Sequence, residues 1–580
     1  MGPGFVVSGV GDDGPMSVQS ESAPARAVRD LADAHVAELA VLDPLLATSL
    51  GLPDGQDRLP DLSPAGQEAL ADLEARTLGA LDALPAPQVP GPTPGPPAPQ
   101  DPSRDHERRC ALLLRERLGA AAATRAAGEH LRDVQILFGP VQQMRTTLTL
   151  MPSDTAEQRE AIAARLARIP DAYAGYTASL RDGVARGLVA APRQVDAVVA
   201  QLDSWLAADW FTGFAQGAGA DGGPATAALA ELRHYLARDY RPHAENVPDG
   251  VGEERYRTAV RRWNGADLDP HEAYAWAWTE FHRILAEQRV AAATIRPGAT
   301  PREAMAYLEA AGEAVEGVEA VRERLQRIIE DAIAALQGTH VDLAPELLRI
   351  EAMIAPEGSA AAPYYTQPSL DFARPGRTWL PTLGRTRFPM WDLVSTWYHE
   401  GVPGHHLQLG QWVRCAGELS TFQSAVGMVS ANLEGWALYA ERLMDELGFL
   451  TDPGSRMGYL DAQMLRAIRV IIDIGMHLGL EIPAHSPVHA GLSWTPELAR
   501  EFFGAYCGRD PAFLDSELLR YLGGPGQAIS YKLGERAWLA GREAARIRHG
   551  VGFDLKAWHM AALSQGSLGL DDLEAELAAL

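Results

Sequence analysis

The segment "WYHEGVPGHHLQ", residues 397–408, holds three histidines at a spacing that a continuous α-helix cannot use for one metal ion. Each helical residue turns about 100° and rises about 1.5 Å, so His399 and His405 would lie about 240° apart around the helix axis. His399 and His406 would share a face but lie about 10 Å apart along it, whereas a zinc–nitrogen bond is only about 2 Å long. In the common zinc peptidase motif, H-E-x-x-H, the two histidines are four residues apart and share a face.

Pro403 and Gly404 give the chain a way to bring two of these histidines together. Proline lacks the amide hydrogen of the helical ladder and glycine tolerates unusual dihedral angles, so we expect a two-residue bulge that places His405 beside His399. A three-residue bulge would place His406 there instead; with the two-residue bulge, His406 is a candidate for substrate binding. Glu400 would lie beside a metal-bound water molecule and act as the general base.

A zinc site built on two histidines needs a further protein ligand, and the segment "SANLEGWALYAERL", residues 430–443, offers a glutamate. Glu434 has mostly apolar neighbours and is our expected third ligand, while Gly435 leaves space for another backbone or a ligand. Glu441 lies on the same helical face, seven residues further on, and is the second choice or a partner of a ligand histidine. We therefore expect one Zn²⁺ per chain, bound by His399, His405 and Glu434.

A polar stripe crosses the apolar segment "MLRAIRVIIDIGMHLGL", residues 464–480, at helical spacing. Its members are Arg466, Arg469, Asp473 and His477. Such a stripe is costly to bury unless its members pair or face a site, so we expect Asp473 to orient His477 and His477 to stabilise an oxyanion. A purely structural ladder of ion pairs is the alternative.

The segment "LLRYLGGPGQAISYKLGERAW", residues 518–538, adds two candidates. Tyr531 can donate a hydrogen bond to a tetrahedral intermediate without carrying charge. Arg520 can hold a substrate carboxylate in a bidentate manner. Tyrosine and arginine also pack in cores and pair on surfaces, so a structural role is the alternative for both residues.

The rest of the chain predicts an all-α fold, mainly helical, with a small β-sheet next to the helix of the histidine motif. From about residue 26 the apolar positions recur at intervals of three and four, and "TAEQ" (155–158) and "TPRE" (300–303) are typical capping boxes. The Pro-rich stretch 84–103 predicts a surface loop. The aromatic and Gly/Pro-rich segment 363–389 predicts short strands, and its Tyr364 and Tyr365 are candidates for an edge along which an extended substrate lies.

Composition restricts the partners and the location. The net charge is −25 over 580 residues, which argues against nucleic acid and anionic membranes as partners. The three cysteines form no C-x-x-C pair, no stretch predicts a membrane span, and residues 1–25 predict a disordered tail without the features of a signal peptide. We expect a cytoplasmic protein; its oligomeric state is beyond the sequence.

Four segments, "HEGVPGHHLQ" (399–408), "EGWALYAE" (434–441), "RVIIDIGMH" (469–477) and "RYLGGPGQAISYKLG" (520–534), resemble the bacterial domain-of-unknown-function 885 family over roughly residues 130–580. That family is similar to the gluzincin metallopeptidases of the thimet oligopeptidase and carboxypeptidase Taq types. The resemblance implies a helical body that encloses a deep channel. It also favours His405 over His406 as ligand, because the Gly404–His405 step takes the place of the Gly-His that closes the gluzincin motif.

Together these features predict a zinc-dependent hydrolase of short peptides or small amides, with a helical region 26–340 packed as one body with a metal-binding region 341–580. Glu400 would activate water, and His477 and Tyr531 would stabilise the oxyanion. One alternative is a metal-dependent enzyme that acts on a specialised small metabolite. Another is a non-catalytic binding protein with a decayed site.

Overall fold

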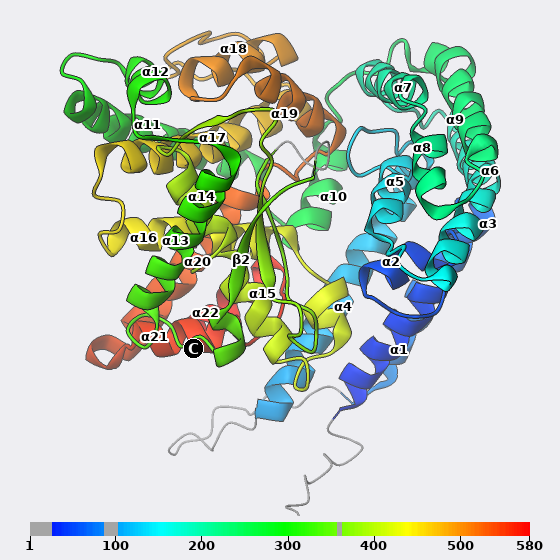
Figure 1. The fold of residues 1–580 in the computed structure, drawn as a ribbon, viewed down its shortest axis with the longest axis horizontal. Coiled ribbons are helices and arrows are strands. Elements are labelled where there is room, and N and C mark those ends of the chain that lie inside the picture. The colour runs from blue at the N-terminus through cyan, green and yellow to red at the C-terminus, as the bar shows by residue number, and fades with distance from the viewer. Residues whose placement is uncertain (1–25, 86–101, 357–361) are drawn as a thin grey trace, which may run out of the picture.

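The computed structural model describes residues 26–85, 102–356 and 362–580, and 68% of these residues are helical, with a few short strands (Figure 1). The predicted all-α class with a small sheet is therefore confirmed. The expected tail 1–25 and residues 86–101 of the expected Pro-rich loop lie outside the described residues. That loop ends earlier than predicted, because a helix already begins at Pro102, where proline fits the first helical turn.

The first half of the chain is a succession of helices, interrupted by one short strand. Its elements are α1 (Ala27–Leu42), α2 (Pro44–Ser49), α3 (Pro64–Ala83), α4 (Pro102–Ala126), η2 (Glu129–Leu131), α5 (Pro140–Leu150), α6 (Ala156–Ala185), α7 (Pro192–Ala207), α8 (Trp210–Ala218), α9 (Gly223–Tyr235), η3 (Leu236–Tyr240), η4 (Arg241–Ala244), α10 (Glu253–Asn264), α11 (Pro270–Ile295), α12 (Pro301–Ala311), β1 (Ala314–Glu316) and α13 (Val318–Leu336).

The second half contains the remaining strands and the helices that carry the sequence motifs. Its elements are η5 (Pro345–Leu348), β2 (Ile350–Ile354), β3 (Tyr364–Thr366), β4 (Gly376–Leu380), β5 (Arg387–Pro389), α14 (Leu393–Glu400), α15 (His405–Arg414), η6 (Phe422–Val426), α16 (Ser430–Glu446), α17 (Pro453–Leu478), α18 (Pro496–Tyr506), α19 (Pro511–Gly523), α20 (Ser530–His549), η7 (Gly550–Gly552), α21 (Leu555–Leu563) and α22 (Leu570–Ala579).

Both predicted capping boxes are present. Thr155 accepts a hydrogen bond from the amide of Gln158 at the start of α6, and Thr300 does the same with Glu303 at the start of α12. In each case the side chain of the later residue reaches back to the backbone of the threonine, so two amides that lack helical partners are satisfied at once.

The buried apolar side chains form two cores. The smaller core lies between Leu45 and Ala244 and is built mainly from α5 to α9, the arc on the right in Figure 1. The larger core joins α1, α3 and α4 to everything from α10 onward. The expected boundary between residues 340 and 341 falls inside this larger core.

Helix α17 runs through the middle of the larger core. Almost every side chain from Met457 to His477 is buried, so the helix has apolar contacts on all sides and no solvent-facing stripe. It packs most extensively against α11, and α14 packs against it as well. The histidine motif at the end of α14 is therefore supported by a helix that is almost completely buried.

Helices α16 and α20 approach closely because two glycines face each other. A Cβ atom on Gly435 would lie 2.4 Å from the backbone carbon of Gly534, so neither position has room for a side chain. The expected role of Gly435, making space for another backbone, is confirmed. The contact fixes Glu434, the neighbour of Gly435, relative to α20.

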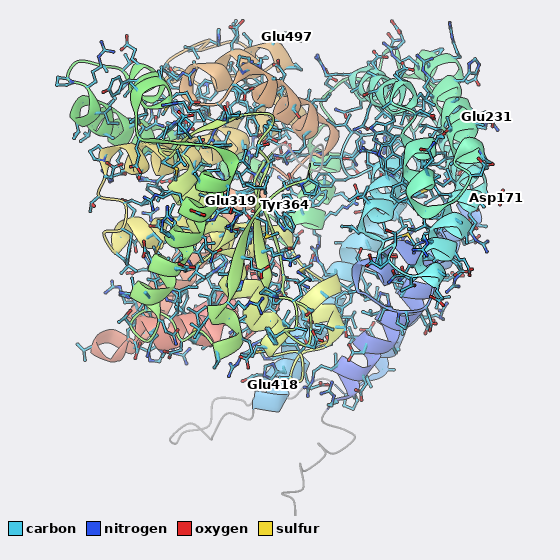
Figure 2. The ribbon with its side chains drawn as sticks, in the orientation of Figure 1. Asp171, Glu231, Glu319, Tyr364, Glu418 and Glu497 are labelled. Carbon is cyan, nitrogen blue, oxygen red and sulfur yellow. The ribbon has the colours of Figure 1, made fainter. Side chains whose placement is uncertain are left out.

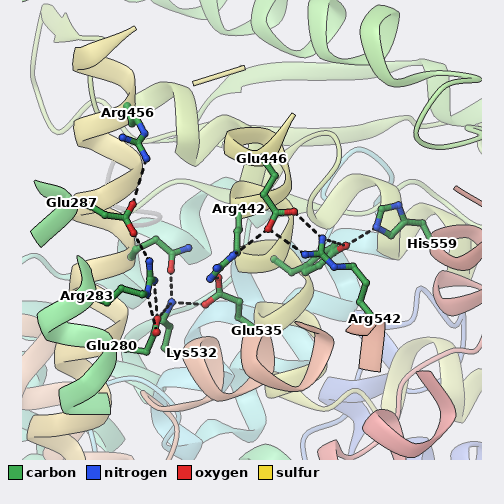
Figure 3. A network of polar contacts seen from close by, with 12 residues as sticks. Glu280, Arg283, Glu287, Arg442, Glu446, Arg456, Lys532, Glu535, Arg542 and His559 are labelled. Atoms are coloured by element: carbon green, nitrogen blue, oxygen red, sulfur yellow. Dashed lines mark hydrogen bonds and ion pairs between the residues drawn. The ribbon is translucent and has the colours of Figure 1, made fainter. Parts of the chain in front are cut away.

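Buried charges also connect the central helices (Figure 3). The ammonium group of Lys532 on α20 is fully buried and pairs with Glu535 on the same helix and with Glu280 of α11, 3.3 Å away. Arg442 of α16 lies 3.8 Å from Glu535. Buried charges are tolerated when they are paired in this way, and the network ties α11, α16 and α20 together.

A small sheet lies ahead of the histidine motif, as predicted for residues 363–389. Its strand order is β2-β4-β3, with β2 parallel and β3 antiparallel to β4; β1 and β5 form a separate antiparallel pair. β3 is therefore an edge strand. Tyr364 of β3 lies in the middle of the view in Figure 2 and stacks on Trp379 of β4, with ring centroids 5.8 Å apart.

Among the described residues, no helix is both long and apolar enough to cross a membrane.

Candidate metal centre

The histidine motif breaks the helix instead of bulging it. α14 ends at Glu400, residues 401–404 form a turn with a cis bond before Pro403, and α15 begins at His405. The expected two-residue bulge in a continuing helix is thus wrong in form. The turn still brings His399 and His405 together, with ring centroids 4.9 Å apart.

Gly404 makes this turn possible. A Cβ atom at this position would lie 1.9 Å from the carbonyl oxygen of His399, a distance that no side chain tolerates. The amide of Gly404 donates to the carbonyl of Tyr398, 3.0 Å away, and the amide of His406 donates to that of Gly401, 3.1 Å away. Backbone hydrogen bonds therefore hold the start of α15 against the end of α14.

Glu434 completes a cluster with the two histidines. Its Oε2 lies 3.4 Å from Nε2 of His399 and 3.6 Å from Nε2 of His405, and the three ligand atoms lie within 4.8 Å of one another. Donors on a tetrahedral zinc with bonds of about 2.1 Å are about 3.4 Å apart. The donor set and these separations fit a zinc ion with an open fourth position.

His399 is oriented by a second carboxylate. Its Nδ1–H donates to Oε1 of Glu441 at 2.9 Å, so Nε2 is left to face the cluster. Glu441 is fully buried and also accepts from the hydroxyl of Ser395. Glu441 is therefore a hydrogen-bond partner of the candidate ligand His399, which is the second of the two roles that the sequence allowed.

Glu400 lies next to the cluster at the end of α14 and is buried. Burial raises the pKa of Glu400, and the charge of Glu434 raises it further, while His399, His405 and Arg466 act in the opposite direction. A carboxyl group with a raised pKa is suited to accept a proton from water and to release it again near neutral pH.

The charges within the cluster also shift the pKa values of His399 and Glu434. Burial is the largest single effect on His399 and lowers its pKa, but hydrogen bonds to Glu434 and Glu441 and the charges of Glu400 and Glu441 together outweigh burial and raise the pKa to about 9. Burial alone would raise the pKa of Glu434, but hydrogen bonds to the two histidines hold it far below its ordinary value. Without a cation, the imidazolium of His399 balances these carboxylates.

Tyr531 lies beside this cluster. Burial raises the pKa of Tyr531 to about 12, and the charge of Glu434 contributes to the shift. The guanidinium of Arg469 lies over its ring, 4.6 Å from the centroid. Tyr531 therefore stays a neutral hydrogen-bond donor, as its expected role requires.

His477 lies away from the metal cluster. Its Nε2–H donates to the carbonyl of Tyr521 at 3.1 Å, and its ring packs on Tyr256. Asp473 accepts from the hydroxyl of Tyr256 and the amide of Gly526 and lies 3.8 Å from His477, too far for a hydrogen bond. Asp473 thus does not orient His477, and their geometry favours the structural alternative.

The expected substrate-binding residues are not gathered at one place. His406 is fully buried: its Nε2–H donates to the carbonyl of Leu347 and its Nδ1 accepts from the hydroxyl of Tyr365, both at 2.9 Å. These bonds occupy His406 and Tyr365 inside the protein, while Tyr364 remains half-buried on the edge strand. The guanidinium of Arg520 is engaged by Glu517 and Gln527.

Sequence reasoning gave no role to Ser395 and treated Arg466 only as part of the polar stripe. Arg466 lies 4.0 Å from Glu441 and its guanidinium lies 5.7 Å from the ring centroid of Tyr531. Its spacing of three and seven from Arg469 and Asp473 was visible. The spacing alone does not show which end of the stripe faces the cluster. In the structure, Arg466 lies near the cluster and His477 lies away from it.

A cleft of about 760 Å³ reaches the metal cluster at Glu434. Its lining residues come from segments that are far apart in the chain, among them α3, α4, α5, α10, the start of α16 and residues 522–527. Gln527, Trp263 and Phe138 are among its lining residues. A space of this volume admits a short peptide or a small molecule.

Comparison with known proteins identifies a family and a fold. The family model described as "Bacterial protein of unknown function (DUF885)" matches residues 44–577. No curated protein matches. A crystal structure of a protein described as a "putative lipoprotein" from Colwellia psychrerythraea superposes with a TM-score of 0.77 at 20% identity, covering 96% of this chain and 99% of that one.

A second structure, of a "putative lipoprotein of unknown function" from Shewanella oneidensis, gives a TM-score of 0.71 at 17% identity, covering 95% of this chain and 99% of that one. At these identities the likeness shows a shared fold, and it extends over nearly the full length of all three chains.

Proposed function

Because the chain belongs to the DUF885 family, whose description leaves the function open, we propose from its own site that it is a zinc-dependent hydrolase of peptide or small amide bonds. The observation that carries the proposal is the convergence of His399, His405 and Glu434 beside the buried carboxyl group of Glu400. The likeness of the family to gluzincin peptidases is part of the same proposal.

The residues around the cluster divide the chemistry among them. A zinc ion held by His399, His405 and Glu434 would supply a Lewis acid and acidify water. Glu400 accepts a proton from the attacking water and passes it to the leaving amine. Tyr531 donates a hydrogen bond to the oxygen on which negative charge develops.

Metal analysis of the purified full-length protein tests this function. We expect about one zinc per chain. A chelator should remove this zinc, and the hydrolysis of short peptides should be lost with it. His399→Ala should lose most of the metal. Glu400→Gln should keep the metal and lose turnover by at least about 100-fold, because it removes the general base and no ligand.

Two results would contradict the proposal. If Glu400→Gln kept full activity, the carboxylate of Glu400 would not be part of the mechanism. If the protein contained no zinc after expression in zinc-supplemented medium, the mechanism would not use zinc. The exposed Glu418→Gln is a matched control, expected to keep both metal and turnover.

The cytoplasmic location also stays a proposal. It is supported by Cys110, Cys415 and Cys507, which are free and buried, as is usual in a reducing compartment. The two similar structures carry a name that places those proteins among lipoproteins. Fractionation of the native host, with immunodetection of this chain, decides between a cytoplasmic and a membrane-attached protein.

A further inference from the structure

Three arginines lie around Tyr531, near the start of α20. Arg466 and Arg469 of α17 approach its ring, at 5.7 and 4.6 Å from the centroid, and Arg520 of α19 joins them through a shared acid. That acid is Glu517, whose Oε2 lies 2.6 Å from Arg469 and 2.7 Å from Arg520. We call Arg466, Arg469 and Arg520 the arginine cluster.

Two N–H groups of the arginine cluster have no hydrogen-bond partner in the described part of the chain. Among the described residues, Nη1 of Arg469 and Nε of Arg466 are buried and have no hydrogen-bond partner. The nearest acid to Arg466 is Glu441, 4.0 Å away, whose oxygens already accept from His399 and Ser395. Buried guanidinium groups normally have all their N–H groups satisfied, so a further acceptor is expected here.

The acids around the arginine cluster are already engaged. Glu517 is shared by Arg469 and Arg520, and the charge of Glu441 also helps to raise the pKa of Arg509. Asp473 is turned toward Tyr256 and Gly526. Because buried charged groups are stable when they are paired, the free N–H groups of Arg466 and Arg469 favour a ligand that brings a negatively charged acceptor.

The position of Arg466 relative to the metal cluster limits the ligand. Its guanidinium lies 5.7 Å from the ring centroid of Tyr531 and 4.0 Å from Glu441, which accepts from His399, so one residue separates Arg466 from the proposed metal ligands. In a short peptide, the negative group this near to the metal is the terminal carboxylate of the residue that follows the cleaved bond.

We propose that Arg466, reinforced by Arg469, binds the C-terminal carboxylate of the substrate, so that the protein acts on short peptides with a free carboxyl end and releases the residue or dipeptide that carries it. This inference rests on the proposed function and adds its substrate class. Arg520, whose guanidinium is already engaged by Glu517 and Gln527, supports the cluster and does not bind the substrate.

Hydrolysis of furylacryloyl-Ala-Phe and of its C-terminal amide tests the substrate class. We expect the wild type to prefer the free acid by about 10- to 100-fold in kcat/KM, the range of one charge-assisted bond, and Arg466→Gln to reduce this ratio to about one. Arg466→Lys keeps the charge and should restore part of the preference. Arg456→Gln, on the same helix but paired with Asp445 and Glu287, should leave the ratio unchanged.

The ratio separates binding from an indirect effect. Arg466 also influences the carboxyl group of Glu400, but that influence changes the hydrolysis of acid and amide equally. Equal loss for both compounds in Arg466→Gln, with the ratio preserved, would overturn the inference. A circular dichroism spectrum and melting temperature like those of the wild type would show that the variant is folded.

Binding without turnover separates this inference from the proposed function. In Glu400→Gln, we expect furylacryloyl-Ala-Phe to bind at least about 10-fold more tightly than its amide by calorimetry, and Arg466→Gln in that background to abolish the difference. If the wild type cleaves neither compound while this difference persists, the proposed function fails and the carboxylate site stands. If the wild type cleaves both compounds equally, the proposed function stands and the inference about the carboxylate site fails.

Discussion

At the scale of single residues, Glu441 and Ser395 determine which nitrogen of His399 faces the cluster. The carboxylate accepts the Nδ1–H at 2.9 Å and is itself fully buried, so its charge acts on the imidazole with little screening by water. His405 has no equivalent: its Nδ1 is buried without a hydrogen-bond partner among the described residues. The two histidines are therefore supported unequally, and the support of His399 matters more.

Replacing Glu441 should weaken the proposed metal site without removing one of its candidate ligands. Glu441→Gln keeps an oxygen that can accept from His399 but loses the charge that makes the imidazole a stronger donor to metal. We expect zinc affinity to fall by about 10- to 100-fold, measured by competition with a chromophoric chelator.

Glu446→Gln is the matched control, since Glu446 is on the same helix and pairs with Arg442 and Arg542 away from the cluster (Figure 3). Its zinc affinity should equal that of the wild type. An unchanged affinity in Glu441→Gln would mean that the hydrogen bond alone, and not the charge, positions His399.

At the scale of the element, the turn between α14 and α15 is the feature on which the proposed metal site depends. It redirects the chain after Glu400 so that the first residue of α15 faces back toward the end of α14. The indole of Trp436 on α16 donates to the carbonyls of Pro403 and Gly404, at 2.9 and 3.1 Å, and so connects the turn to the helix that carries Glu434.

Gly404→Ala should disrupt this turn. The added Cβ would overlap the carbonyl oxygen of His399, and the chain can relieve the overlap only by moving the end of α14 or the start of α15. We expect zinc affinity to fall by at least about 10-fold and the free energy of unfolding to fall by about 1–3 kcal/mol, measured by metal competition and urea unfolding.

Gly417→Ala, shortly after the end of α15, is the control, because a Cβ there has no neighbour within 4 Å. It should leave metal affinity and stability within about 0.5 kcal/mol of the wild type. Normal zinc binding in Gly404→Ala would show that the turn has another conformation that still joins the two histidines.

At the scale of the whole molecule, several histidines are buried in the neutral form. Burial lowers the pKa of His406, His477 and His559 to about 4. His559 lies in an aromatic cage, where its Nε2 accepts from the hydroxyl of Tyr439 at 2.8 Å. Between about pH 4 and 6.5 the unfolded chain binds protons at these histidines that the folded protein does not, so folding becomes less favourable as the pH falls through this window.

His559→Gln should reduce this pH dependence. Glutamine can still accept from Tyr439, but it does not take up a proton in the unfolded chain. We expect a lower free energy of unfolding at pH 7 and a loss between pH 7 and 4.5 that is smaller than that of the wild type by up to about 3 kcal/mol, measured by urea unfolding at both pH values.

His243→Gln tests whether any histidine would have the same effect. His243 is exposed, so this variant should lose as much stability on acidification as the wild type. If His559→Gln and His243→Gln behave alike, burial of His559 does not contribute to the acid sensitivity.

The sequence by itself determined the helical class, both capping boxes and the site of the strands, because these depend on neighbours within a few residues. The sequence also identified His399, Glu400, His405 and Glu434 as a group. The His-Glu pair, the Pro-Gly step before His405 and the following glutamate in an apolar helix leave few other candidates for metal ligands. Gly435 was recognised as a point of close approach for the same local reason.

Only the tertiary structure decided what each remaining polar residue faces. His477 and Arg466 are on one helical stripe, yet Arg466 faces Tyr531 and Glu441 while His477 faces Tyr256 and Tyr521. His405 and His406 are adjacent in the sequence, but the start of a new helix directs one toward Glu434 and the other toward Leu347 and Tyr365. Helical periodicity gives the angle between side chains; what each side chain meets depends on packing between segments that are from about 25 to more than 200 residues apart in the sequence.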